Sequence, residues 1–66
     1  MNLNERLKEL RLEAGYTLKV VSEGIGIPLS TYSNYEQGIR EPSVAIIKRI
    51  CDFYGISADY LLGRVD

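Results

Sequence analysis

Glycine recurs at the ends of short segments with helical spacing, and this limits the chain to a set of short helices. The glycines that follow such segments are Gly15, Gly26, Gly38 and Gly55. Glycine often follows the last helical residue because it adopts the left-handed backbone conformation without a steric penalty. No stretch between these glycines alternates apolar and polar residues with a period of two, so no strand is expected. The sequence therefore predicts an all-α fold.

Residues that favour the first turn of a helix mark where each helix begins. Four of them can cap a helix through a side-chain oxygen: Asn2, Thr17, Ser43 and Ser57. The remaining start is marked by Pro28, whose fixed φ suits a first helical turn. The second helix is expected to end around Gly24 and Gly26. The predicted helices span residues 2–14, 17–24, 28–36, 43–54 and 57–62.

The 66 residues are enough for only one small domain, which we place at residues 1–66. Such a domain needs nearly every large apolar residue for its core, and 45% of its residues are hydrophobic. Tyr32 and Tyr35 lie three residues apart and are expected on the inward face of the third helix. The apolar stripe expected on the fourth helix consists of Val44, Ile47, Ile50, Cys51 and Tyr54. Because the chain ends at Asp66, shortly after the fifth helix, we expect a free-standing domain.

The composition argues against several classes of protein. Cys51 is the only cysteine, so no disulfide can form within the chain, and a lone buried thiol suits the cytoplasm. No apolar run approaches the roughly 20 residues that a membrane span needs. The chain has no histidine, no glycine-rich phosphate loop and no cluster with metal-ligand spacing. We therefore expect no enzyme activity, metal, cofactor, membrane partner or small-molecule ligand.

The segment Thr17–Glu36 is the most informative about function. It holds two helices of about two turns each, separated by Gly26-Ile27-Pro28. A short glycine-containing turn between two such helices is typical of a helix-turn-helix unit. The second helix then projects outward and is narrow enough to enter a DNA major groove roughly 12 Å wide. The net charge of −1 gives no general attraction for phosphate, so local contacts would have to support DNA binding.

Five stretches of the chain form a recognisable pattern: Leu7–Arg11, Gly15–Leu18, Gly26–Gly38, Arg40–Ser43 and Tyr54–Gly63. In this order and at this spacing they resemble the phage-repressor helix-turn-helix family, of the Cro/cI-like or XRE type. The resemblance implies a compact five-helix domain of the lambda-repressor-like type. It also implies a DNA-binding transcriptional regulator, most often a repressor.

The resemblance further implies which residues would meet DNA. The positions expected to meet base edges are Leu29, Ser30, Thr31, Ser33 and Asn34. Those expected to contact phosphates are Thr17, Leu18, Lys19, Pro28, Gln37, Ile39 and Arg40. Asparagine can pair with adenine through two hydrogen bonds, hydroxyl groups bond several bases, and leucine suits a thymine methyl group. Arg40 could instead pair with Glu36 or Glu41 on the surface.

The family pattern also implies an ion pair between Arg11 and Glu36 that ties the first helix to the third. We expect this pair to orient the recognition helix, because a buried ion pair adds little net stability relative to apolar side chains. The chain departs from the pattern at three places. Leu18 stands where glutamine usually contacts DNA, Ser22 replaces a small alanine, and no lysine or arginine lies between positions 28 and 35. The first and third departures lower the expected affinity for DNA.

Two functions of different class remain open at this stage. The first is a sequence-specific regulator that binds double-stranded DNA as a homodimer on an inverted repeat. Its dimer interface is expected where a short fifth helix cannot bury every apolar residue, at Ile56, Tyr60, Leu61 and Leu62. If the core takes up two of the last three, this surface becomes smaller. The second is a protein-interaction module, such as an antitoxin-like or adaptor domain, that keeps the fold without binding DNA. The net charge, Leu18 and the uncharged third helix favour this alternative.

Overall fold

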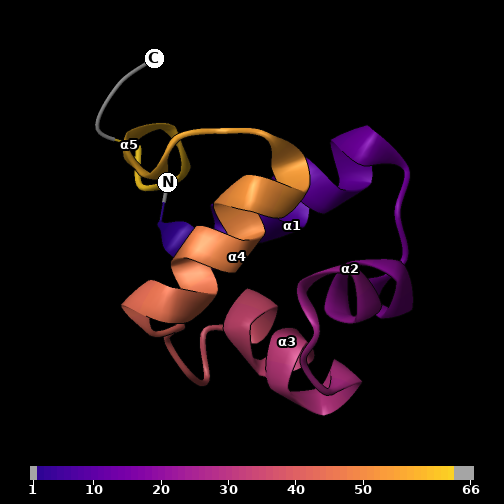
Figure 1. Ribbon diagram of the computed structural model, residues 1–66. Coiled ribbons are helices and arrows are strands. Elements are labelled where there is room, and N and C mark those ends of the chain that lie inside the picture. The colour runs from indigo at the N-terminus through magenta and orange to yellow at the C-terminus, as the bar shows by residue number, and fades with distance from the viewer. Residues whose placement is uncertain (1, 64–66) are drawn as a thin grey trace.

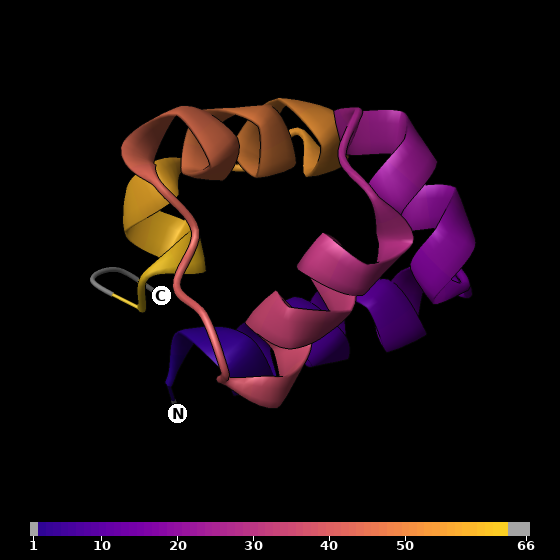
Figure 2. The same ribbon diagram turned by 90° about the horizontal axis from the view of Figure 1, so that it is seen from below.

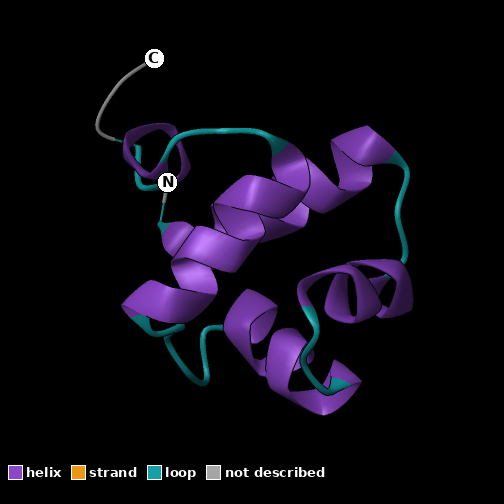
Figure 3. Cartoon of the chain, in the orientation of Figure 1, coloured by secondary structure: helices purple, strands orange, loops and turns teal. Residues whose placement is uncertain are grey.

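The computed structural model describes residues 2–63 and contains, within that range, five helices and no strand (Figure 1, Figure 3). The helices are α1 (Leu3–Ala14), α2 (Leu18–Ile25), α3 (Leu29–Gln37), α4 (Val44–Tyr54) and α5 (Ala58–Leu61). α1 packs against α3 and α5, α2 packs against α3 and α4, and α4 packs against α5. In Figure 2, α4 and α1 lie along opposite edges of the molecule. The predicted all-α fold is confirmed.

Each helix begins one residue later than predicted, because the starting residue is itself the cap. Four side-chain oxygens accept hydrogen bonds from the backbone N–H group three residues later in the chain. The N···O distances are 3.1, 3.1, 3.3 and 3.0 Å for Asn2, Thr17, Ser43 and Ser57. A capping residue keeps an extended backbone and therefore stands outside the first turn. Pro28 has the same extended backbone, with a ψ of 146°, and precedes α3 instead of lying within its first turn.

Gly24 lies inside α2 and does not end the helix. The helix stops before Gly26, whose φ of 77° lies in the left-handed region. A Cβ atom at position 24 would overlap the ring of Phe53 on α4. Any larger residue at position 24 would therefore force the Phe53 ring to move.

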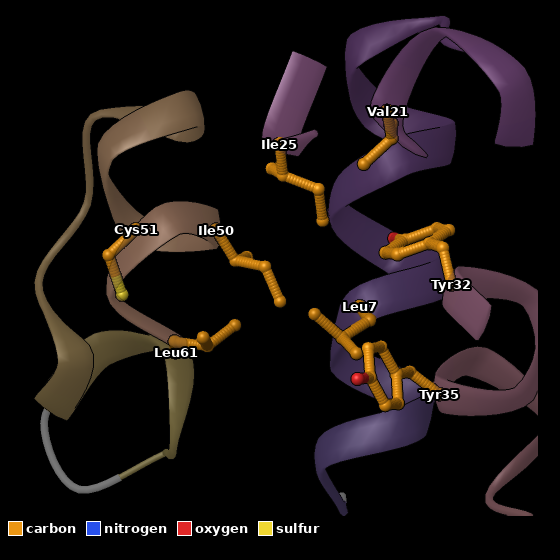
Figure 4. Packing of buried hydrophobic residues seen from close by; sticks show 8 residues of the cluster. All are labelled: Leu7, Val21, Ile25, Tyr32, Tyr35, Ile50, Cys51 and Leu61. Carbon is orange, nitrogen blue, oxygen red and sulfur yellow. The ribbon is translucent and has the colours of Figure 1, made fainter. Parts of the chain in front are cut away.

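Every helix contributes to one core, which is shown in Figure 4. Its buried hydrophobic side chains are Leu7, Val21, Ile25, Tyr32, Tyr35, Ile50, Cys51 and Leu61. Tyr32 and Tyr35 are 0% and 8% exposed, which confirms the predicted inward face of α3. The prediction that Val44 belongs to the core stripe is wrong, because this first residue of α4 is 72% exposed.

Arg11 joins three parts of the fold through hydrogen bonds. Its Nε and Nη2 atoms donate to the two carboxylate oxygens of Glu36 on α3, at 2.8 and 3.0 Å. Its Nη1 atom donates to the carbonyl of Tyr16, in the turn between α1 and α2, at 3.1 Å. The Arg11 and Glu36 side chains are only 13% and 6% exposed. The ion pair implied by the resemblance is therefore present, in a two-pronged and mostly buried form, and it raises the pKa of Arg11.

Two tyrosine hydroxyls lie buried beside this ion pair. Those of Tyr32 and Tyr54 form no hydrogen bond within the described part of the chain. Burial is the main reason that the pKa of each phenol is raised, for Tyr54 to about 12, and the nearby carboxylate of Glu36 adds to both shifts. The folded protein therefore resists ionisation of these phenols.

We expect Glu36→Ala to lower the free energy of unfolding by about 3–5 kcal/mol, because it leaves the Arg11 guanidinium buried without its partner. Chemical denaturation measures this loss. The matched control is Glu9→Ala, which removes an exposed partner of Arg6 at 3.7 Å and should cost less than about 1 kcal/mol. Equal losses in the two variants would contradict a structural role for the buried pair.

Stability is expected to fall as the pH rises above 10. An unfolded tyrosine ionises near pH 10, whereas Tyr54 in the folded state keeps its proton up to about pH 12, so the unfolded state binds fewer protons in this window. Thermal melting between pH 8 and pH 12 on a Tyr54→Phe variant should show a shallower alkaline decline than the parent. Tyr16→Phe, at a more exposed tyrosine, is the matched control. An unchanged slope in Tyr54→Phe would argue against burial of this phenol.

Candidate nucleic-acid interface

The turn between α2 and α3 is fixed by backbone hydrogen bonds. The N–H groups of Gly26 and Ile27 both donate to the carbonyl of Ser22, at 2.9 and 3.0 Å. The Ser22 hydroxyl is buried and donates to the carbonyl of Lys19 at 3.0 Å. The serine that replaces the family's usual alanine therefore has the partner that a buried hydroxyl requires. After the turn, α3 packs against α2 and lies along the lower surface of the molecule in Figure 1.

The outer face of α3 is polar and accessible. Tyr32 and Tyr35 turn inward, so the residues between and before them face outward or sideways. Leu29 is 47% exposed and Ser30 is exposed. Thr31, Ser33 and Asn34 are half-buried. The five side chains predicted to meet bases thus form a surface of one leucine, three hydroxyl groups and one amide.

One hydrogen bond links the two predicted sets of DNA contacts. Gln37 Nε2 donates to Ser33 Oγ, one helical turn away, at 2.7 Å. In this bond the Ser33 hydroxyl oxygen is the acceptor, so its own proton is available for another hydrogen bond. A serine held in this way can donate to acceptors such as guanine O6, thymine O4 or a phosphate oxygen.

Most of the residues predicted to contact phosphates are exposed: Thr17, Lys19, Pro28, Gln37, Ile39 and Arg40. Leu18 differs, because it is half-buried and packs against the core. Lys19 lies 3.9 Å from Glu23 in an exposed pair that is weak in water. Arg40 forms no ion pair with Glu36, Glu41 or any other residue of the described range, so its charge is available.

The core takes up part of the apolar surface predicted for dimerisation. Leu61 is 1% exposed and belongs to the core, so its side chain is not accessible to a second chain. Ile56 is half-buried against the core, and Leu62 is 42% exposed. The ring of Tyr60 is half-buried, and the Arg6 guanidinium lies over it, 5.0 Å from the ring centre. The patch that remains consists of Ile56, Tyr60 and Leu62.

Residues 2–63 contain no group of three or more acidic, cysteine or histidine side chains that could hold a metal ion. None of the described helices combines the length and the apolar character required to cross a membrane.

The chain is similar to a known protein family and to known transcriptional regulators. Residues 7–61 match the helix-turn-helix family HTH_3. The transcriptional regulator ImmR of Bacillus subtilis is 42% identical over 64 residues, covering 97% of this chain and 50% of that protein. The regulator AnsR of the same organism is 41% identical over 64 residues, covering 97% of this chain and 54% of its own length. The chain thus spans about half the length of these two relatives.

Two solved structures share the fold of this chain. A transcriptional regulator from Listeria innocua superposes with a TM-score of 0.87 at 25% identity, covering 98% of this chain and 61% of that one. The P22 c2 repressor, solved with a synthetic operator, has a TM-score of 0.86 at 21% identity and covers 94% of each chain. At 21% identity the second likeness establishes the fold alone. Both named relatives are HTH-type transcriptional regulators. The match over residues 7–61 shows that this chain belongs to the helix-turn-helix family HTH_3.

Proposed function

We propose that this protein binds duplex DNA in a sequence-specific manner, as a transcriptional repressor, with α3 in the major groove. The observation that supports this most is that α3 has an exposed polar face and is also held in place by a buried ion pair. Short hydroxyl and amide side chains on a rigid, protruding helix suit hydrogen bonding to base edges. A helix that docks onto another protein would more often present exposed aromatic or apolar anchors.

The contacts with the DNA backbone come from both ends of the helix-turn-helix unit in this proposal. Thr17 and Lys19 lie at the start of α2, while Gln37 and Arg40 lie at the end of α3 and in the loop after it. These contacts hold α3 in register and contribute no sequence preference of their own. Leu18 is turned toward the core, so the backbone amides of this turn would replace the side-chain contact that glutamine makes in the family.

We further propose that the protein acts as a homodimer on an inverted repeat. One helix without a positive charge gives few phosphate contacts per chain, and two chains joined by two-fold symmetry double that number. The half-sites would then lie about one helical turn apart. Ile56, Tyr60 and Leu62 are the candidate interface, since they form the apolar surface that α5 leaves uncovered.

Selection from a random duplex library tests this function. The purified protein is incubated with the library at low salt, and the bound pool is sequenced. Enrichment of an inverted repeat would support the proposal and would give the spacing of the half-sites. A folded protein that enriches no sequence would contradict it and would favour the protein-interaction module.

Asn34→Ala should relax the preference for one base pair in each half-site and cost roughly 1–3 kcal/mol in specific binding. Competition binding with the enriched duplex, substituted at one position at a time, measures this change. The loss should be confined to a single position, because the amide would pair with one base. An unchanged preference at every position would remove Asn34 from the set of base contacts.

A further inference from the structure

A hollow of about 200 Å³ lies between α1, the start of α2 and α3. The side chains around it are Lys8, Arg11, Leu18, Ser33, Glu36 and Gln37. Arg11 and Glu36 close its base, because they are paired and mostly buried. Ser33 and Gln37 belong to the face of α3 that the proposed function directs toward DNA. The hollow therefore opens on the same side as the recognition helix.

Lys8 is the unpaired positive charge at the rim of this hollow. Its side chain is exposed and forms no ion pair with any residue of the described range. The acidic side chain of Glu9 is instead 3.7 Å from Arg6, and Glu36 is engaged by Arg11. Glu5, one turn before Lys8, makes no ion pair with it. The Lys8 ammonium is therefore free to bind an external anion.

The position of Lys8 on α1 places it alongside the C-terminal half of α3. Asn4, Lys8 and Arg11 lie at helical spacings of four and three residues and so share one face of α1. Arg11 contacts Glu36 on α3, and a Cβ atom at Gly38 would lie 3.4 Å from the amide of Asn4. Lys8 lies between these two contacts. It thus flanks the stretch from Ser33 to Gly38, which contains or adjoins the predicted phosphate contacts.

We propose that Lys8 contacts a DNA backbone phosphate from α1 and so supplies a positive charge that α3 lacks. This inference rests on the proposed function. Leu18 packs against the core, and α3 contains no lysine or arginine, so the unit itself offers little charge near the middle of α3. A four-carbon side chain at the rim of the hollow can reach past Ser33 and Gln37 toward the backbone that borders the groove. A contact of this kind strengthens binding to every sequence equally.

The test compares Lys8→Gln with Lys48→Gln, which removes the same charge from an exposed position on α4. The probes are the inverted-repeat duplex enriched by the parent protein and a scrambled duplex of the same length. Affinity is measured over a series of salt concentrations. Thermal melting establishes that both variants fold like the parent, as expected for exposed lysines without ion pairs.

Lys8→Gln should reduce the slope of log affinity against log salt concentration by about 0.9 per bound protomer, and Lys48→Gln should change it much less. Lys8→Gln should weaken binding to both duplexes by the same factor. Lys8→Arg keeps the charge and should restore the parent's dependence of affinity on salt. Equal slopes in Lys8→Gln and Lys48→Gln, with the parent binding its operator, would overturn this inference alone. A parent protein that binds neither duplex would overturn the proposed function as well.

Discussion

The two-pronged ion pair between Arg11 and Glu36 is the interaction on which the geometry of the site depends. It joins α1 to α3, and a third hydrogen bond from Arg11 fixes the turn before α2. Removing two charges from water costs several kcal/mol, so such a pair contributes little net stability compared with apolar side chains of similar size. Its directional hydrogen bonds can instead fix the angle at which α3 leaves the body. Recognition of base edges requires a fixed angle of this kind.

The small size of the core imposes a second constraint on α3. This helix has nine residues, and two of them, Tyr32 and Tyr35, are committed to the interior. Tyrosine fills more of the core than leucine would, and so a short helix can be anchored by two side chains. The rest of the helix is then free to carry small polar groups. Because these two tyrosines occupy the inward face of α3, Leu29 at the start of the helix is exposed although it is apolar.

The caps and the terminal glycines made most of the fold predictable from sequence, because both signals act locally. All five predicted starts lie one residue too early, because a residue that caps a helix, or a proline that precedes it, stands just outside the first turn. The exposure of Val44 and the burial of Leu61 depend on where α4 and α5 cross the core, which no local pattern specifies. Gly24 likewise resembled a helix end, whereas its role comes from Phe53, 29 positions away.

The candidate site was predictable to a similar extent. The ion pair and the exposed face of α3 could be anticipated from the family pattern, because each position there has a recurrent role. The role proposed for Lys8 could not be predicted from the sequence, because only the packed structure shows that this residue borders the same hollow as Ser33 and Gln37. A lysine on the polar face of a helix is ordinarily a solvated surface residue. The sequence contained one indication of this role, which is that Lys8 lies on the same face of α1 as Arg11.

The central claim is that the Arg11–Glu36 pair orients α3 for recognition and adds little to stability. The most direct test is the double variant Arg11→Met, Glu36→Leu, examined by thermal melting and by binding to the enriched and scrambled duplexes. We expect a melting temperature close to or above that of the parent. We also expect a preference for the enriched duplex that is lower by about tenfold or more, which corresponds to about 1.4 kcal/mol. A double variant that unfolds readily, or one that keeps the parent's full preference, would contradict the account.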